Sequence, residues 1–296
     1  MVKINEIRCK TACNKISSMP YDWDLNVYRG CGHGCKYCFA LYSHQYINSN
    51  DYFNEIFVKT NIVEALERQL KSPSWKKKII NLGGVTDNYQ PVEANYKLMP
   101  EVLKLMIKYK NPVVISSKSD LVLRDYDLIA ELADITYVNV AATITAADEN
   151  IRKLIEPNGV SSLRRFNMLK EFRKTNASVG MHVMPVIPFI TDSYENLNSL
   201  FAQAKDNGIH YALVALLNLR GPTKGTFFEF IRQSFPHLYN SLLPMYKTGW
   251  VGKDEYKENL YKMVFEIRKK YSITNNYNAP MKEKIKSEGA AQLSLF

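Results

Sequence analysis

Cysteine is missing from most of this chain. All five cysteines, Cys9, Cys13, Cys31, Cys35 and Cys38, lie near the start, and residues 39–296 contain none. Cysteines used as small apolar core groups would be scattered along the chain, whereas a cofactor site collects its ligands in one loop. The odd number also argues against a scaffold of disulfide bonds. The distribution therefore indicates a metal or cluster site in the first part of the chain.

Long apolar runs are missing as well. No stretch of about 18 consecutive apolar residues occurs, so we expect no membrane span and no membrane partner. The opening sequence MVKINEIRCK lacks the apolar segment of a secretory signal. We therefore expect a cytoplasmic protein.

The composition excludes a disordered chain, because 46% of the 296 residues are hydrophobic and can form a substantial core. Basic residues exceed acidic ones by 39 to 29, with basic runs at residues 76–78, 164–165, 173–174 and 268–270. A basic surface can bind a polyanion through phosphate contacts. Charge alone is equally compatible with a basic surface that has no nucleic-acid partner.

Apolar runs rich in β-branched residues predict six strands. Most of the runs are continuous rather than alternating, as in a parallel sheet that is covered on both faces. Helical patterns separate them, with Asn61 as the expected N-cap of the first helix and Gly208 just after the last. The strands are expected at residues 25–30, 78–84, 112–118, 135–145, 178–188 and 209–218, and the helices at 61–70, 98–108, 123–133, 161–174 and 195–206.

This alternation predicts an α/β fold, a partial (β/α)6 TIM-like barrel with its active site at the carboxyl ends of the strands. The rest of the chain supplies no further units, but a stripe of apolar residues from Tyr256 to Tyr271 predicts an amphipathic helix on the outside of the barrel. We divide the chain into an N-terminal segment (1–20), the barrel (21–221), a helical C-terminal extension (222–286) and a flexible tail (287–296).

Three of the cysteines form a compact motif after the first expected strand. Cys31, Cys35 and Cys38 have the spacing C-x3-C-x2-C, with glycines between the first two. Three thiolates can hold a four-iron cube and leave one iron open, as catalytic metal centres leave a position for substrate. The alternative is a zinc ion with His33 or His44 as the fourth ligand.

This loop, with the aromatic Tyr37 before the third cysteine, resembles the loop of the radical S-adenosylmethionine (SAM) superfamily. The strings at residues 24–31 and 83–93 are similar to the branch related to spore photoproduct lyase, often called DNA-repair-photolyase-like. The similarity extends from the first expected strand to about Asn218.

The resemblance implies a 4Fe-4S cluster held by Cys31, Cys35 and Cys38, with the amino and carboxylate groups of SAM on the open iron. One electron, from a donor such as flavodoxin or ferredoxin, would cleave SAM to methionine and a 5′-deoxyadenosyl radical, which takes a hydrogen atom from the substrate. The cofactor then does the difficult chemistry, and the protein supplies geometry and shielding.

The resemblance also assigns residues around SAM at the end of the second strand. Gly83 and Gly84 would let the backbone approach the SAM amino group, and Thr86 and Asp87 would follow as polar partners. The alternative is an ordinary turn between strand and helix that Asp87 caps.

Further cofactor contacts are expected at the ends of the next strands. Lys118 is expected to pair with the methionyl carboxylate, although a lysine at a strand end is usually only solvated. Thr143 and Thr145 are expected to reach the ribose hydroxyls, and backbone groups of Tyr37 the adenine.

Two more residues have open roles. Tyr89 is expected near the radical as a catalytic group. His182, inside the fifth expected strand, is either a catalyst or a hydrogen-bonded core group, and the second is the more common case for a strand histidine.

One departure from the family pattern concerns hydrogen return. Spore photoproduct lyase carries a hydrogen-donating cysteine in the segment that corresponds to residues 83–87, and this chain has none there. The resemblance therefore does not extend to dimer reversal by that route. Cys9 and Cys13 are either substitutes that fold back or peripheral thiols.

The last five residues resemble the peptide with which bacterial replication and repair proteins bind the DNA sliding clamp. Gln292 would bond at the rim of an apolar cleft, and Leu293, Leu295 and Phe296 would complete the motif. The alternative is an apolar tail that packs on its own barrel.

Three functional hypotheses follow. The first is a radical SAM enzyme of the spore photoproduct lyase type that acts on DNA in lesion repair or processing. The second keeps this chemistry but moves it to tRNA, a peptide or a small metabolite. The third, from another class, is a zinc-stabilised nucleic-acid-binding protein without catalysis.

Overall fold

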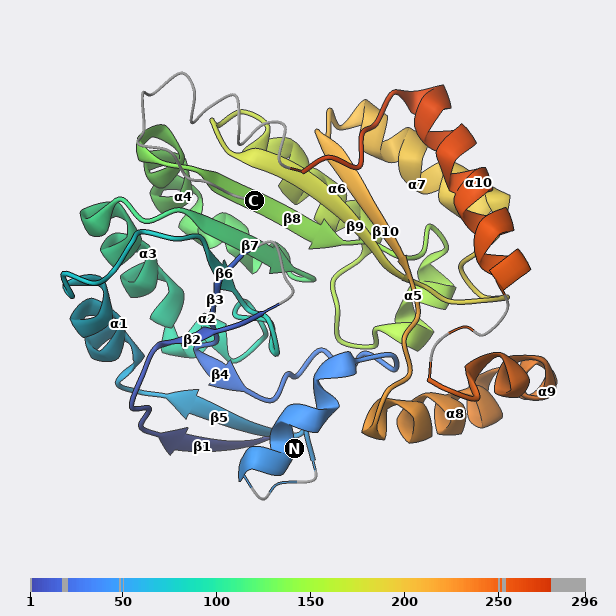
Figure 1. Cartoon of the computed structure of the whole chain (residues 1–296), viewed down its shortest axis with the longest axis horizontal. Coiled ribbons are helices and arrows are strands. Elements are labelled where there is room, and N and C mark those ends of the chain that lie inside the picture. Colours follow the sequence, from blue (N-terminus) through green and yellow to red (C-terminus); the bar gives the residue numbers. More distant parts are fainter. Residues whose placement is uncertain are drawn as a thin grey trace.

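The computed structural model describes residues 2–17, 21–47, 49, 51–249, 251 and 254–277. Its centre is a curved sheet of seven strands in the order β10-β9-β8-β7-β6-β3-β2 (Figure 1). Six of these strands are parallel, and only β2 runs antiparallel to its neighbour β3. The strands span Cys13–Lys15 (β2), Trp23–Leu25 (β3), Ile80–Leu82 (β6), Val113–Ser117 (β7), Val138–Thr143 (β8), Ser178–Val186 (β9) and Tyr211–Leu216 (β10). The partial barrel of six parallel strands is therefore confirmed.

Helices follow the strands and cover the outer face of this sheet (Figure 1). Their apolar sides meet the strands in one hydrophobic core, which includes Leu66, Val102, Leu132, Leu169 and Leu200. These helices are α1 (Ile62–Leu70), α3 (Leu98–Tyr109), α4 (Tyr126–Ile135), α6 (Ser162–Phe172) and α7 (Tyr194–Asp206), with the shorter α2 (Glu93–Tyr96), α5 (Glu149–Ile155) and 3-10 helix η2 (Asp120–Asp125) between them. The five expected helices are all present within a few residues.

The first expected strand is wrong in its extent. Residues 25–30 do not form one strand, because only Leu25 belongs to β3. The chain then leaves the main sheet, and β4 (Tyr28–Arg29) pairs antiparallel with β5 (Glu55–Lys59) in a second sheet whose outer strand is β1 (Lys3–Ile7). This exchange of sheets brings the following cysteine loop across the open mouth of the barrel.

The expected cap of α1 is also different. Asn61 stands at the N-cap position, but its side chain makes no capping hydrogen bond. Its amide instead accepts from the backbone N–H of Cys9 and donates to the Cys9 carbonyl, at 2.8 and 2.9 Å. The residue therefore ties the N-terminal segment to the barrel. At the end of α7 the expectation is correct, since Gly208 has the left-handed φ of +67°.

The C-terminal helices pack on the barrel at two places. The helix α10 (Asp254–Tyr271) lies along α7 on the outside, as expected, with Leu260, Val264 and Ile267 in the main core (Figure 1). The helix α8 (Pro222–Ser234) contacts the 3-10 helix η1 (Phe39–Ile47), and 3-10 helices η3 (Pro236–Leu238) and η4 (Leu243–Tyr246) flank α9 (Tyr239–Leu242). The division into four segments stays a prediction, and the tail from residue 287 lies outside the described residues.

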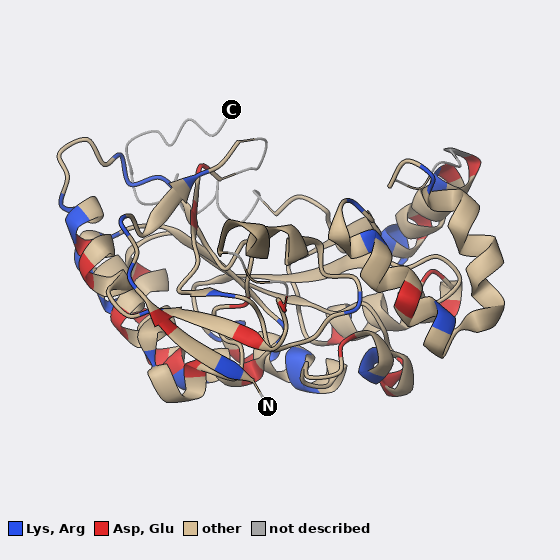
Figure 2. Cartoon of the chain, turned by 90° about the horizontal axis from the view of Figure 1, so that it is seen from below, with Lys and Arg blue, Asp and Glu red and all other residues tan. Residues whose placement is uncertain are grey.

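Charged residues of both signs are mixed along the helices at either side of the view in Figure 2. Among the described residues, no helix has the length and the apolar character needed to cross a bilayer.

Candidate functional site

The cysteine loop, residues 30–38, is held from four sides. The Cys31 N–H donates to the Tyr52 carbonyl at 3.1 Å, and the Lys36 N–H donates to the Ile155 carbonyl at 2.9 Å. The Thr223 hydroxyl of α8 donates to the Cys38 carbonyl at 2.8 Å, and the Gln90 side chain accepts from the Gly32 N–H at 2.8 Å. A loop without regular structure thus has a defined backbone course, because distant segments satisfy its polar groups.

Glycine is required at the start of this loop. Gly30 has a φ of +79°, and a Cβ there would lie 2.6 Å from the Glu55 carbonyl oxygen. A larger residue would therefore clash with β5 in a backbone conformation that L-residues rarely adopt.

The three loop cysteines are buried or half-buried free thiols close enough to interact electrostatically. Burial raises the pKa of Cys31 and Cys35 to about 12 and that of Cys38 to about 11. Metal binding would have to displace these protons, since thiolates are the ligands. The donor set fits an iron-sulfur cluster, in which each of three irons takes one cysteine.

The zinc alternative does not fit the histidines. His33 Nε2 lies 2.9 Å from the Asp87 carboxylate and Nδ1 lies 3.3 Å from the Asn158 carbonyl. His44 Nε2 bonds the Glu55 carbonyl at 3.1 Å. Both candidate fourth ligands therefore have structural partners.

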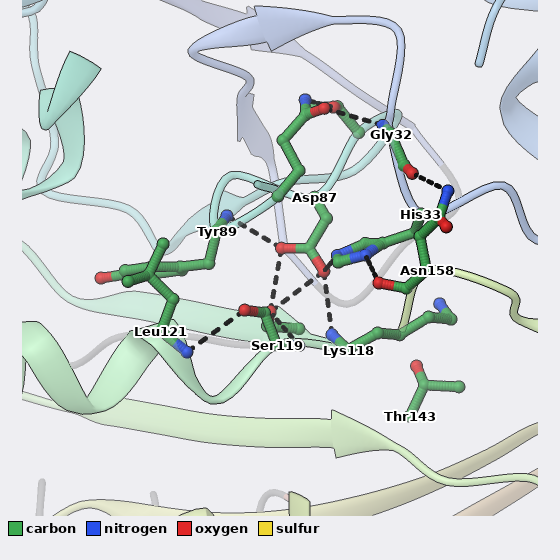
Figure 3. Close-up of polar contacts among 12 residues, drawn as sticks. Gly32, His33, Asp87, Tyr89, Lys118, Ser119, Leu121, Thr143 and Asn158 are labelled. Atoms are coloured by element: carbon green, nitrogen blue, oxygen red, sulfur yellow. Dashed lines mark hydrogen bonds and ion pairs between the residues drawn. The ribbon is translucent and has the colours of Figure 1, made fainter. Parts of the chain in front are cut away.

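Asp87, in the turn after β6, connects the cysteine loop to the end of β7 (Figure 3). Its carboxylate accepts from the Ser117 hydroxyl at 2.9 and 3.0 Å and from the Lys118 N–H at 2.8 Å, both at the end of β7. It also faces His33 and accepts from the Tyr89 N–H at 2.9 Å. Burial alone would raise the pKa of Asp87, but His33 and these donors outweigh it and lower the pKa to about 2.

These contacts favour the turn alternative for Asp87. The bond from the Tyr89 N–H closes an Asx turn, and both carboxylate oxygens already have protein partners. A direct bond from Asp87 to SAM stays a prediction, but the geometry gives the residue a positioning role first. Thr86 is similarly engaged, because its hydroxyl donates to the Gly30 carbonyl at 2.6 Å.

Gly83 and Gly84 precede Thr86 and Asp87, and each position requires glycine for a different reason. Gly83 has a φ of +104°, which a turn at this place requires. A Cβ on Gly84 would lie 2.0 Å from a carboxylate oxygen of the buried Asp24. The expected close approach at Gly84 is therefore made by a protein carboxylate, which also accepts from Asn26 and Asn81 at 2.9 and 2.7 Å.

Lys118 stands at the mouth of the barrel. Its ammonium lies 5.8 Å from the centroid of the Tyr37 ring and has no hydrogen-bond or ion-pair partner among the described residues. Burial on its own would lower the pKa of Lys118, but Cys35, Glu156 and Asp87 together raise it. The side chain is therefore a charged donor that is available to an anionic ligand.

The two expected ribose contacts, Thr143 and Thr145, lie at the end of β8 and just after it. Thr143 closes β8, next to β7 in the sheet, and Figure 3 draws it on the same side as Lys118. Thr145 is fully buried, and its hydroxyl has no partner among the described residues. Such an orphaned hydroxyl is uncommon in a folded protein and suits a ligand contact.

A buried ion pair beside the loop was not foreseen. Glu156 and Arg165 have fully buried side chains, and Oε2 of the first lies 2.5 Å from Nη1 of the second. The Tyr37 hydroxyl donates to the other oxygen of Glu156, and Arg165 Nη1 donates to the Thr143 carbonyl at 2.7 Å. The pair thus fixes the residue between the second and third cysteines.

This network corrects one interpretation of the sequence. Residues 164–165 were counted as a basic surface run, but only Arg164 is exposed, where it pairs with Asp120. The buried position of Arg165 depends on Gly159, because a Cβ there would lie 2.5 Å from Arg165 Nη2. A glycine that makes room for a guanidinium is visible only in three dimensions.

The Tyr89 side chain is buried beside Arg124. Its side chain is 1% exposed, and the ring is 6.0 Å from the guanidinium carbon of Arg124. Figure 3 shows the ring turned away from Asp87 and Lys118. The expected role of Tyr89 near the radical stays a prediction, and its backbone N–H donates to Asp87.

The buried pair should matter strongly for stability. We expect Glu156→Ala to lower the free energy of unfolding by about 3–5 kcal/mol, because it leaves Arg165 charged and unpaired. Glu171→Ala is the control, since its partner Lys174 is exposed and the loss should be at most about 0.5 kcal/mol. Urea titrations followed by circular dichroism give both values, and equal losses would contradict the role of the pair.

Uncharacterised proteins are similar to all or most of the chain. One from Mycobacterium tuberculosis is 31% identical over 301 residues, which covers 100% of this chain and 88% of that protein. Another, from Methanocaldococcus jannaschii, is 27% identical over 269 residues and covers 91% of this chain and 95% of its own length.

Solved structures share the fold. A variant of spore photoproduct lyase superposes with a TM-score of 0.65 at 13% identity and covers 90% of this chain and 79% of its own. Another, with bound AdoMet and dinucleoside spore photoproduct, has a TM-score of 0.63 at 13% identity over 90% and 78% of the chains. SuiB of Streptococcus suis, bound to its precursor peptide SuiA, has a TM-score of 0.54 at 15% identity over 92% and 53%.

The family model of the radical SAM superfamily matches residues 25–201, which include the cysteine loop and most of the barrel. The cysteine spacing, the partial barrel and this match agree. The chain belongs to the radical SAM superfamily, whose members use a 4Fe-4S cluster and S-adenosylmethionine.

Proposed function

We propose that this radical SAM enzyme acts on DNA, in the repair or processing of a lesion. The observation that carries the proposal is the convergence of the cysteine loop, Lys118 and Thr143 at one mouth of a barrel that shares its fold with spore photoproduct lyase over 90% of the chain. The net charge of +10 is suited to a polyanionic substrate.

In this proposal Cys31, Cys35 and Cys38 hold the 4Fe-4S cluster. When bound and reduced, by a donor such as flavodoxin or ferredoxin, the cluster supplies the electron that cleaves SAM. A reducing compartment such as the cytoplasm suits the five free thiols.

The protein's own groups bind and orient SAM. Lys118 pairs with the methionyl carboxylate, because its ammonium has no other anionic partner in bonding distance among the described residues. The hydroxyls of Thr143 and Thr145 reach the ribose, and the backbone of Tyr37 reaches the adenine. The turn at Gly83 directs backbone groups toward the amino end of SAM, with Asp87 and Thr86 holding that turn against the cysteine loop.

The ligand assignment can be tested on iron content and turnover together. We expect Cys31→Ala, Cys35→Ala and Cys38→Ala each to lose the cluster iron and to reduce SAM cleavage at least about a hundredfold, because each removes one thiolate ligand. Cys9→Ala is the control, since Cys9 bonds Asn61 through its backbone and should keep the iron. Retention of iron by all three loop variants would refute the assignment.

The substrate class can be tested by the response of SAM cleavage to nucleic acids. We expect UV-irradiated duplex DNA to stimulate cleavage by the reduced holoenzyme more than undamaged duplex or tRNA. The concentration of DNA for half-maximal effect should rise at least about tenfold between 50 and 200 mM salt, through counterion release. Stimulation by tRNA alone, or by none of the three, would overturn the DNA proposal and favour a tRNA, peptide or metabolite substrate.

Recruitment to DNA is proposed through the last five residues. We expect deletion of residues 292–296 to abolish capture of the bacterial sliding clamp, since Gln292, Leu293, Leu295 and Phe296 would fill its cleft. Ser294→Ala is the matched control and should be captured normally. Undiminished capture after the deletion would exclude the tail as the contact.

A further inference from the structure

His182 faces the inside of the barrel. Its neighbours in β9, Met181 and Val183, are fully buried in the core between sheet and helices, whereas His182 is only half-buried. Because side chains alternate along a strand, the imidazole points to the opposite face. It is in register with Thr143 of β8 and Leu213 of β10, near the carboxyl edge of the sheet.

A tyrosine ring lies next to this histidine. Tyr211 of β10 pairs with Gly180 of β9, and a Cβ on Gly180 would lie 2.1 Å from Tyr211 Cζ. Glycine is therefore needed for the ring to lie across β9. Tyr211 is 1% exposed, and its ring centroid lies 6.1 Å from that of His182.

We call the hydrogen-bonded group of Ser116, Asn139, Ser178, His182 and Tyr211 the floor. Its hydrogen bonds have a defined direction. The Asn139 amide nitrogen donates to the Ser178 hydroxyl at 3.2 Å, so its oxygen is the acceptor for the Tyr211 hydroxyl at 2.9 Å. Because that hydroxyl has only one proton, Tyr211 can only accept from His182 Nε2, 3.4 Å away. Asn139 thus assigns the proton of the neutral imidazole to Nε2.

The other imidazole nitrogen then carries a lone pair. His182 Nδ1 lies 3.2 Å from the Ser116 hydroxyl, which is the donor in this tautomer. His182 and Ser116 are half-buried, whereas Asn139, Ser178 and Tyr211 are buried. The network is therefore anchored by buried residues, and its two half-buried members, His182 and Ser116, are the ones that a ligand can reach.

The floor is electrically neutral near neutral pH. Burial and the positive charge of Lys118 lower the pKa of His182 to about 4. The groups packed around the imidazole are Lys118 and Ser116 from the β7 side and Tyr211 from β10. A ligand at this level meets an acceptor nitrogen and a rotatable hydroxyl, not a second cation.

We propose that His182 and Ser116 bind the substrate through an adjacent donor and acceptor, such as the N–H and C=O edge of a nucleobase, and that Asn139 and Tyr211 position His182 for this contact. The ligand N–H donates to Nδ1, and the Ser116 hydroxyl turns to donate to the ligand carbonyl. Amide-like edges of this kind are uncharged, which matches the floor. The assignment of a nucleobase rests on the proposed function.

The substrate contact can be tested in the holoenzyme with UV-irradiated duplex DNA as the probe. We expect His182→Gln and Ser116→Ala each to reduce the DNA-dependent part of SAM cleavage about tenfold or more, because a site that hydrogen-bonds a substrate group discriminates strongly when one partner is lost. The iron content per chain should equal that of the wild type. Tyr246→Phe is the control, since its buried hydroxyl has no hydrogen-bond partner among the described residues. Wild-type DNA dependence in both variants would overturn the proposal.

The positioning role has a readout that needs no substrate. We expect 15N spectra of histidine-labelled protein at pH 7, assigned with His182→Gln, to show His182 as the Nε2–H form, and Tyr211→Phe to give a mixture of tautomers. An Nδ1–H or doubly protonated His182 in the wild type would overturn the inference. If the wild-type enzyme shows no response to DNA at all, the proposed function fails, and this spectrum alone decides whether Asn139 and Tyr211 position His182.

Discussion

The shape of the site depends on one buried carboxylate. The cysteine loop has no regular secondary structure of its own, and Asp87 links it through His33 to the end of β7. The carboxylate stays ionised although burial opposes this, because five polar contacts converge on it. Removing water from a charged group is costly, so such a group persists only where its partners are fixed. The cysteines, the lysine at the mouth and the turn after β6 therefore keep one relative arrangement.

Charge compensation explains the second layer of the site. Glu156 and Arg165 neutralise each other, and Lys118 keeps its proton because anionic groups surround it. The groups around His182, by contrast, are neutral hydrogen-bond donors and acceptors. The residues around the proposed cofactor position are thus charged, whereas the group around His182 is neutral near neutral pH.

Local patterns predicted what local forces determine. The parallel strands were visible as continuous apolar runs, and the cysteine spacing identified the loop because its three cysteines are close in sequence. The split of residues 25–30 between two sheets was not visible, since it depends on β5, whose residues 55–59 pair with Tyr28 and Arg29. The same holds for Arg165, which looks like a surface charge until Glu156 is beside it, and for Asn61, whose cap is replaced by a bond to Cys9. For Tyr89 the motif located the backbone in the turn after β6, but it carried no information about the ring, which lies beside Arg124.

The long sequence separation of the contacts on the cysteine loop has a consequence for biosynthesis. Tyr37 meets Glu156 after 119 further residues, and Cys38 meets Thr223 after 185. During translation the thiols leave the ribosome long before the segments that bury them, and long-range contacts form late. The nascent chain therefore exposes three reactive cysteines in a flexible loop. The contacts that hold the loop are therefore complete only after α8 has been made.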